Sequence, residues 1–321
     1  MARYLITGIA GFIGSTLAHT LVERGDEVRG IDNLSTGSLD NLADIRGRID
    51  FQQMDVQDAA GMRTACEGVE YILHQAALAS VPRSVKYPLA SHQSNLNGTL
   101  VLLIAARDAR VRRIVYAASS SAYGDQPTQP KHEEMPPLPL SPYAVQKLAC
   151  EYYIQAFYRS YGMEGICLRY FNIFGPRQVA DSPYSGVIAK FTTSMMAGET
   201  PTIFGDGLTS RDFTYIDNAV SANLLACEAP SSVATGRVFN IGTGESHTLN
   251  EVYTAIAGLL GFSGRPVYGF PRAGDIRHSL ADIGRATKEL GYQPVASLHN
   301  GLQKTVAWYL AEKEKKEAAA P

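Results

Sequence analysis

The sequence is poor in cysteine and has no excess of charge of either sign. Only four of its 321 residues are cysteines, and no two of them form a CxxC pair. This scarcity argues against a zinc site or a disulfide framework and favours a reducing compartment. The formal net charge of −2 provides no general attraction to nucleic acid. Any phosphate that the protein binds must therefore be held by a few local cationic or backbone groups.

The sequence also lacks a long apolar run and the three regions of a signal peptide. No segment approaches the ~20 apolar residues of a transmembrane helix. Hydrophobic residues at 45% and charged residues at 19% are ordinary for a soluble enzyme. We therefore expect a soluble, cytoplasmic protein without a membrane partner, long enough for one large domain or two.

Short β-rich segments alternate with helical ones through the first half of the chain. The helical segments include 12–24 and 89–107. This alternation predicts an α/β fold in which helices cover both faces of a doubly wound parallel sheet. The predicted strands span residues 3–7, 27–32, 49–55, 69–74, 112–118 and 165–170.

Past residue 170 the pattern loosens, and loops with proline and glycine interrupt short helices. The change predicts two domains, of which 1–170 binds a nucleotide cofactor and 171–321 is a smaller α+β domain that binds substrate. Strands near 212–242 are expected to return to the first sheet, so the boundary is approximate.

The stretch TGIAGFIG lies between the first predicted strand and helix, with Gly8, Gly11 and Gly14 three residues apart. Glycines at this spacing permit a tight turn and a close backbone approach to a pyrophosphate at the helix N-terminus. A plain turn is the alternative. Asp32 ends the second strand, where its carboxylate can accept both ribose hydroxyls of NAD and would repel the 2′-phosphate of NADP. NAD is therefore the predicted cofactor.

The segment LSPYAVQK carries the strongest chemical signal. Ser141 and Pro142 are of the residue types that begin a helix, so Tyr143 lies in its first turn and Lys147 four residues on, on the same face. A neighbouring ammonium, a helix N-terminus and the positive charge of a nicotinamide ring would all favour the phenolate, which makes Tyr143 a candidate base near neutral pH. Such a pair also occurs by chance on helix surfaces. The cofactor motif and the hydroxyls of AASSSAYG before it favour the functional interpretation.

Seven motifs follow one another along the chain: TGIAGFIG, HQAA, AASSSAYG, SPYAVQK, RYFNIFGPRQ, GDGLTSRDFTYIDN and RAGDIRHSLAD. Together they resemble the extended short-chain dehydrogenase/reductase family that acts on nucleotide sugars. Within it the chain resembles UDP-sugar 4-epimerases, especially the UDP-N-acetylglucosamine 4-epimerase type. The resemblance covers the chain to about residue 310 and implies a Rossmann-like sheet with a smaller α+β substrate domain.

The resemblance implies a catalytic triad of Ser119, Tyr143 and Lys147. Tyr143 would take the proton of the sugar 4-hydroxyl, directly or through Ser119, while NAD takes the C4 hydride. The 4-keto sugar would turn in the site and accept the hydride on its other face, so that C4 is inverted and NAD regenerated. Lys147 would bind the nicotinamide ribose and lower the pKa of Tyr143.

A larger cofactor site around the glycine turn is implied as well. Asp55, at the end of the third predicted strand, is expected at the adenine edge, with a cap of the next helix as an equal alternative. The full predicted NAD site comprises Gly8, Gly11, Phe12, Ile13, Gly14, Asp32, Asn33, Ser35, Thr36, Gly37, Asp55, Val56, Gln75, Ala76, Ala77, Tyr143, Lys147 and Tyr170.

The resemblance places the UDP diphosphate against Arg211 and Arg272, beside Asn172, and the uridine ribose against Asp275. Arginines suit phosphate oxygens, although either arginine alone could equally form a surface ion pair with a nearby aspartate. Ser279 stands where the resembling enzymes have a gate beside the sugar 2-substituent, and a small residue there admits an N-acetyl group. The other predicted substrate residues are Ser80, Arg83, Ser119, Ser120 and Ser121.

Three alternatives remain open. Arg83, Arg177 or Arg277 could serve a carboxylate, which would make the protein a UDP-glucuronate 4-epimerase. Related dehydratases and decarboxylases carry carboxylates where this chain has Ser120 and Ser121, and hydroxyls cannot perform that acid–base chemistry. Some relatives bind NAD as regulators without catalysis, but they typically lose the Tyr–Lys pair that is present here.

The chain is expected to form a homodimer and to bind no metal. By resemblance, the helices 89–107 and 143–160 pair with their copies as a four-helix bundle, which would cover apolar stripes on them. The histidines show no metal-ligand spacing. The predicted partners are a UDP-sugar and a second copy of the chain, without nucleic acid.

Overall fold

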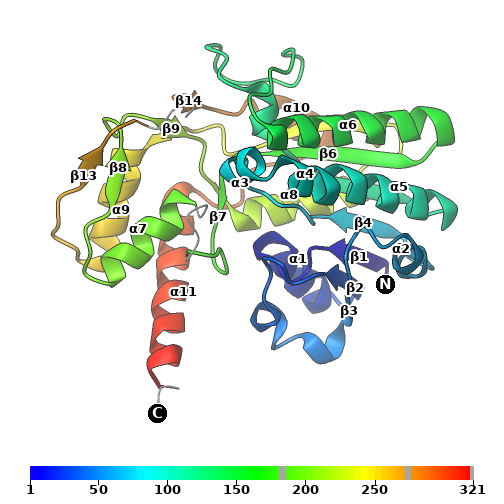
Figure 1. Ribbon diagram of the computed structural model, residues 1–321, viewed down its shortest axis with the longest axis horizontal. Coiled ribbons are helices and arrows are strands. Elements are labelled where there is room, and N and C mark those ends of the chain that lie inside the picture. The colour runs from blue at the N-terminus through cyan, green and yellow to red at the C-terminus, as the bar shows by residue number, and fades with distance from the viewer. Residues whose placement is uncertain (181–185, 272–275, 319–321) are drawn as a thin grey trace.

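A computed structural model describes residues 1–180, 186–271 and 276–318 (Figure 1). Its central sheet consists of β1 (Arg3–Thr7), β2 (Glu27–Asp32), β3 (Asp50–Gln53), β4 (Tyr71–His74), β5 (Arg113–Ser119), β6 (Glu164–Tyr170) and β11 (Thr235–Ile241). All neighbouring strands are parallel, in the order β11-β6-β5-β4-β1-β2-β3. After β3 the chain crosses back over the sheet, so that β4 lies on the other side of β1 and the later strands continue in the opposite direction. This reversal confirms the doubly wound sheet.

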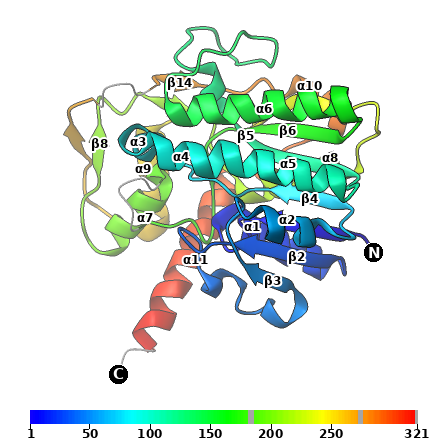
Figure 2. The same ribbon diagram turned by 45° about the vertical axis from the view of Figure 1, so that its right-hand side comes forward.

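Helices cover both faces of this sheet (Figures 1 and 2). Alternate residues of β5 face opposite ways: Ile114 and Tyr116 join one buried apolar cluster, and Val115 and Ala117 join the other. The first cluster packs under α2 (Ala59–Cys66), α5 (Gly98–Asp108) and α6 (Pro142–Tyr161). The second packs under α1 (Phe12–Glu23) and α8 (Ile216–Glu228), with α10 (Gly284–Leu290) beside β11.

The start of α6 fixes where its functional side chains lie. Ser141 Oγ accepts a hydrogen bond of 3.2 Å from the N–H of the third helical residue, and Pro142 stands in the first turn. Gly162 ends the helix with a φ of 68°, in the left-handed region. Tyr143 therefore lies in the first turn, and Lys147 lies one turn further, in the interior.

The helix predicted before β5 is interrupted by a wider turn. Between α4 (Pro88–His92) and α5 lies η3 (Gln93–Asn97), one stretch of π-helix. Inside it, Asn95 Oδ1 accepts a hydrogen bond of 2.7 Å from the N–H of Leu78, and Asn95 Nδ2 donates to Gln146 Oε1 of α6 at 2.9 Å. A buried amide therefore stabilises the wider turn.

The two strands expected to return to the large sheet lie in the segments DFTYI and RVFNIG. Only the second does so, as β11. The segment DFTYI contains β10 (Thr214–Tyr215), which pairs with β7 (Ile173–Phe174) in a separate two-stranded sheet. That expectation was wrong because the chain enters α8 directly after Tyr215 and leaves a strand of only two residues.

The segments that do not join the large sheet form a smaller part beside it (Figure 1). A domain boundary near residue 170 stays a prediction, because α8 and β11 belong to the first part. The smaller part comprises α7 (Val187–Met196), β8 (Thr202–Phe204), β9 (Ser210–Arg211), β12 (His247–Thr248), α9 (Leu249–Leu260), β13 (Val267–Gly269), β14 (His278–Ser279) and α11 (Leu298–Ala318).

The described ranges contain no helix that is long and apolar enough to cross a bilayer. They also bring no three His, Cys, Asp or Glu side chains into an arrangement that could hold a metal ion. All four cysteines are buried and unpaired.

Candidate active site

The glycine turn between β1 and α1 is packed too closely for side chains. Gly8 has a φ of 71°, and a Cβ there would lie 2.8 Å from the backbone nitrogen of Ala76. A Cβ on Gly14 would lie 2.1 Å from the carbonyl oxygen of Gly8. Only glycine fits either position, so the backbone at the start of α1 stays accessible to a phosphate.

Asp32 lies beside this turn at the end of β2. Its Oδ2 accepts the N–H of Ala10 at 2.9 Å, and its Oδ1 accepts the N–H of Leu34 at 2.8 Å. Each oxygen keeps a further lone pair for a ligand. Burial raises the pKa of Asp32, and the two N–H groups oppose that shift. A partly buried carboxylate at this point fits the hydroxyls of a ribose and disfavours an added phosphate.

A cavity of about 600 Å³ runs along the turn and reaches α3 (Val81–Lys86). Two predicted substrate residues line it, Ser80 and Arg83. The predicted cofactor residues in its lining are Gly8, Gly11, Phe12, Ile13, Gly14, Asp32, Asn33, Ser35, Thr36, Val56, Gln75, Ala76 and Ala77. The lining also contains residues that the sequence analysis missed: Ile31, Met54, Leu78, Ala79, Tyr87, Ser94, Gln178, Val179 and Gly186.

Asp55 and Tyr170, predicted for the cofactor, are not in this lining but form hydrogen bonds with residues that are. Asp55 Oδ2 accepts a hydrogen bond of 2.7 Å from Asn33 Nδ2, and the Tyr170 hydroxyl accepts one of 3.4 Å from Gln75 Nε2. Asp55 does not cap α2, because Asp58 accepts the N–H groups of that helix at 3.1 Å. Gly37 likewise packs against the glycine turn.

His74 ties β1 to β4 below the glycine turn. Its Nδ1 lies 2.6 Å from Thr7 Oγ1, and its Nε2 lies 2.8 Å from Thr99 Oγ1. Thr7 Oγ1 in turn accepts the N–H of Ala76 at 3.1 Å. Burial, with a smaller effect of Lys147, lowers the pKa of His74 to about 3. The imidazole ring is therefore neutral, and its two nitrogens hold Thr7 and Thr99 in place by hydrogen bonds.

Ser119, Tyr143 and Lys147 come together at the end of β5. Ser119 is the last residue of this strand, and its hydroxyl lies close enough to the Tyr143 side chain to lower the pKa of the phenol. Lys147 Nζ donates to the carbonyl oxygen of Ala117 at 2.7 Å and lies 6.0 Å from the centroid of the Tyr143 ring. Ser84 Oγ accepts the backbone N–H of Tyr143 at 3.1 Å, a contact that the sequence analysis missed.

Burial dominates the electrostatics of the Tyr–Lys pair. It raises the pKa of Tyr143 to about 12, against a smaller lowering by the hydrogen bond with Ser119. It lowers the pKa of Lys147 to about 8. In the chain by itself, desolvation of the phenolate exceeds the effect of its polar neighbours. The phenolate expected near neutral pH therefore stays a prediction for the protein with nicotinamide bound. A cationic ring bound beside the phenol would shift its pKa back down.

Three serines lie in succession at the end of β5, and the hydroxyls of two of them are joined by a hydrogen bond. Ser121 Oγ donates to Ser119 Oγ at 2.8 Å, and the N–H of Ser121 points to the same oxygen at 3.2 Å. Ser120 begins the short helix η4 (Ser120–Tyr123) between them. No residue of this cluster carries a carboxylate, so it can orient a sugar hydroxyl and pass a proton but cannot serve as an acid–base pair for elimination.

A buried ion pair lies behind Lys147. Arg169 Nε and Nη2 donate to Glu151 Oε1 and Oε2 at 2.9 and 2.8 Å, and both residues are buried. Glu151 lies one turn past Lys147 on α6, and its charge opposes the desolvation that lowers the pKa of Lys147. The catalytic helix is therefore anchored to β6 by two parallel charge-assisted hydrogen bonds.

The predicted nucleotide and sugar residues gather around β9. Ser279 of β14 lies in register with Arg211 of β9 and is buried. Arg211 Nη1 donates to the carbonyl oxygens of Ser210 and Arg277 at 2.9 and 3.3 Å. Asn172 Nδ2 donates to the carbonyl oxygen of residue 212 at 3.5 Å. The other two predicted residues, Arg272 and Asp275, lie outside the described residues.

A second cavity of about 620 Å³ lies at the C-terminal ends of β8 and β13, and its lining includes Asp206 and Arg277. The structure does not bring all predicted substrate residues to one cavity. Ser80 and Arg83 line the first, whereas other members of the set are in the lining of neither: Ser119, Ser120, Ser121, Asn172, Arg211 and Ser279.

The chain matches the NAD dependent epimerase/dehydratase family over residues 4–242. It is 40% identical over 311 residues to the UDP-glucose 4-epimerase of Mycolicibacterium smegmatis, a match that covers 96% of this chain and 98% of the relative.

Solved structures are similar over almost the whole chain. One is the UDP-N-acetylglucosamine 4-epimerase from Methanobrevibacter ruminantium in complex with UDP-N-acetylmuramic acid, with a TM-score of 0.93, 38% identity, and coverage of 97% of this chain and 99% of that one. Another is the Thermus thermophilus UDP-glucose 4-epimerase in complex with NAD, with a TM-score of 0.87, 35% identity, and coverage of 96% and 99%.

Proposed function

The chain belongs to the NAD dependent epimerase/dehydratase family and is an NAD-dependent UDP-sugar epimerase, and from this premise we propose that it inverts C4 of UDP-N-acetylglucosamine and UDP-N-acetylgalactosamine, and also of UDP-glucose and UDP-galactose. The observation that carries the C4 chemistry is the contact of Ser119, Tyr143 and Lys147 beside a loop of hydroxyls without a carboxylate. Such a site can oxidise and reduce a carbinol but has no pair for elimination.

The residues present fit NAD. The glycine turn has no room for side chains where a pyrophosphate would approach, and Asp32 keeps lone pairs for the adenosine ribose. Lys147 Nζ donates one hydrogen bond to the carbonyl oxygen of Ala117 and lies 4.8 Å from the centroid of the Tyr116 ring, and its remaining N–H donors would bind a ribose diol. When bound, NAD supplies the acceptor for the C4 hydride and returns the hydride to the same carbon.

The chain's own residues move the proton. Tyr143 Oη, beside the Ser119 hydroxyl, would hold the proton of the sugar 4-hydroxyl while the carbon is a ketone and return it afterwards. The hydrogen bond from Ser121 fixes the Ser119 hydroxyl, so a proton can pass along these oxygens. The N–H bond to Ser84 holds the first turn of α6, and with it the phenol.

The acetylated substrates are proposed because of Ser279. Its side chain is small and buried, on the strand that pairs with the one bearing Arg211. A serine leaves space beside the sugar 2-substituent that a larger residue would fill. The similar solved structure that is a UDP-N-acetylglucosamine 4-epimerase supports this choice, while the relative that is a UDP-glucose 4-epimerase supports the hexoses.

Nuclear magnetic resonance of the sugar protons tests the proposal. The purified protein, without added NAD, is expected to convert UDP-N-acetylglucosamine into UDP-N-acetylgalactosamine and UDP-glucose into UDP-galactose. Conversion of UDP-glucose alone would contradict the open pocket at Ser279. Turnover of UDP-glucuronate alone would favour Arg83, which lines the first cavity, as a carboxylate partner. No conversion, even with NAD supplied, would contradict the enzyme assignment.

We also propose a homodimer through the helices before β5 and α6. These helices lie side by side (Figures 1 and 2) and expose large apolar side chains, among them Leu89 at 69% and Val145 at 51%. A bundle with the same helices of a second copy would cover them. Light scattering is expected to give about twice the chain mass of 34.7 kDa. A monomer at micromolar concentration would contradict this proposal.

A further inference from the structure

Asp212 is a buried carboxylate that the proposed mechanism does not use. Its Oδ1 accepts the N–H and the hydroxyl of Thr243, both at 2.8 Å, and the hydroxyl of Thr214 at 3.2 Å. Its Oδ2 accepts the N–H groups of Gly244 and Ala281 at 3.0 and 3.4 Å. One side chain therefore joins three segments that are far apart in sequence: the link from β9 to β10, the turn after β11, and the chain after β14.

The backbone of the same residue contacts the predicted substrate residues. Asp212 follows Arg211 directly, its N–H donates to the carbonyl oxygen of Ser279 at 2.8 Å, and its carbonyl oxygen accepts from Asn172 Nδ2 at 3.5 Å. The backbone packs closely against this carboxylate, because a Cβ on Gly242 would lie 2.5 Å from Asp212 Oδ2. A shift of this carboxylate would thus move the residues proposed to face the nucleotide sugar.

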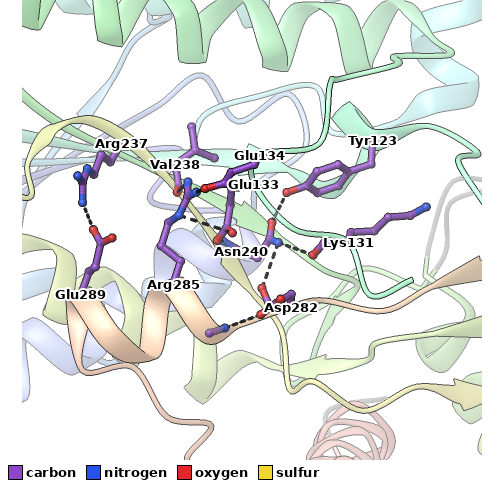
Figure 3. A network of polar contacts seen from close by, with 11 residues as sticks. Tyr123, Lys131, Glu133, Glu134, Arg237, Val238, Asn240, Asp282, Arg285 and Glu289 are labelled. Atoms are coloured by element: carbon purple, nitrogen blue, oxygen red, sulfur yellow. Dashed lines mark hydrogen bonds and ion pairs between the residues drawn. The ribbon is translucent and has the colours of Figure 1, made fainter. Parts of the chain in front are cut away.

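A second buried group holds the other end of the segment that carries Ser279, residues 278–282, here termed the wall segment. Asn240 Nδ2 donates to the carbonyl oxygens of Lys131 and Asp282 at 2.8 and 3.2 Å, and Asn240 Oδ1 accepts the Tyr123 hydroxyl at 2.6 Å (Figure 3). Tyr123 ends η4, the helix that follows Ser119. The wall segment is therefore fixed between Asp212 and a link to the serine cluster.

We propose that Asp212 is the positioning residue of the substrate end, which holds the wall segment and β9 together so that Arg211 and Ser279 face the UDP-sugar. This inference rests on the proposed function, because it takes these two residues as substrate contacts. Asp212 itself is enclosed by protein donors and has no surface exposed to a substrate. Its contribution should therefore appear in nucleotide affinity and leave the hydride and proton steps nearly unchanged.

Two variants of the NAD-loaded enzyme test the proposal. Asp212→Asn keeps the shape but replaces one acceptor oxygen by an N–H₂ group that faces N–H and hydroxyl donors. It is expected to weaken UDP binding, measured by titration calorimetry, by about 10- to 100-fold, the usual effect of losing charge-assisted hydrogen bonds. Thr243→Val removes a single donor and is expected to weaken it by about 3- to 10-fold. KM should rise by the same factors, with kcat and bound NAD nearly unchanged.

Matched substitutions provide the controls. Asp217→Asn changes an exposed aspartate that pairs with Lys304 on the surface, and Thr192→Val changes a buried threonine of α7 that bonds only within its helix. Both should leave UDP affinity unchanged.

The outcomes separate this inference from the proposed function. A wild-type protein that binds no UDP would overturn the proposed function. A wild type that binds UDP, with Thr243→Val and Asp212→Asn binding it equally well, would overturn the inference. Loss of NAD together with UDP would show a general structural role and overturn it too. If Asp212→Asn does not fold, Thr243→Val decides, since it keeps the carboxylate and its other four hydrogen bonds.

Discussion

Replacement of Tyr143 by phenylalanine is expected to lower kcat for epimerisation by about 10²- to 10⁴-fold, the usual contribution of a general acid or base. The substitution removes the hydroxyl that contacts Ser119 and keeps the ring beside Lys147. The fold and the glycine turn should be unaffected, so bound NAD should be retained. The rate is measured by nuclear magnetic resonance, and bound NAD by absorbance after denaturation.

The matched control is Tyr253→Phe, which loses a hydrogen bond of 2.9 Å to the carbonyl oxygen of Gly264, in the smaller part of the molecule. This variant should keep its activity. Tyr143→Phe protein with more than about a tenth of the wild-type rate would contradict the assigned role. The same pair of variants tests the regulator hypothesis, because a cofactor-binding regulator would not depend on this hydroxyl for its function.

Ser279→Tyr is expected to lower kcat/KM for UDP-N-acetylglucosamine by about 10- to 200-fold, the range that pocket shape alone provides. UDP-glucose should be affected much less, because it lacks the acetamido group that would meet the new ring. Ser279 is buried in β14, so a phenol placed there must enter the space beside the sugar or displace its neighbours. Initial rates on both substrates measure the effect.

Ser279→Ala serves as the control and should alter neither substrate's kcat/KM by more than a few fold, since it removes only a hydroxyl. Equal losses on both substrates with the tyrosine variant would mean that the ring distorts the wall segment generally, and the gate would be refuted. Unchanged rates on both would place Ser279 away from the sugar.

The cofactor end of the site could be predicted from sequence because its chemistry is local. Gly8, Gly14 and Asp32 are fixed by one strand, one turn and the next strand. The cavity residues Gln178 and Val179 lie more than a hundred residues further on. Nothing in their surroundings indicates the cavity, because tertiary packing brings them there.

Burial is the property of this site that residue spacing does not indicate. Asp212 next to Arg211 has the sequence pattern of a surface ion pair, yet its carboxylate is fully enclosed and bonded to other segments. Tyr143 beside Lys147 has the pattern of an activated phenol, yet desolvation raises its pKa to about 12. Residue spacing identifies which groups are neighbours along a helix or loop, but solvent exclusion depends on the whole fold.

The π-helical turn η3 constrains how the chain can change in length. Each residue added to a helix rotates everything beyond it by about 100°, so the extra residue between α4 and α5 sets the angle between the faces of these two helices. The turn places Ser94 in the wall of the first cavity and Asn95 against α6. Deletion of any one residue here would rotate the residues on one side of the turn relative to those on the other. Ser94 would then no longer face the first cavity while Asn95 faces α6. Loss or gain of one residue would therefore require every contact on one side of the turn to be rebuilt, whereas a substitution changes the contacts of one side chain.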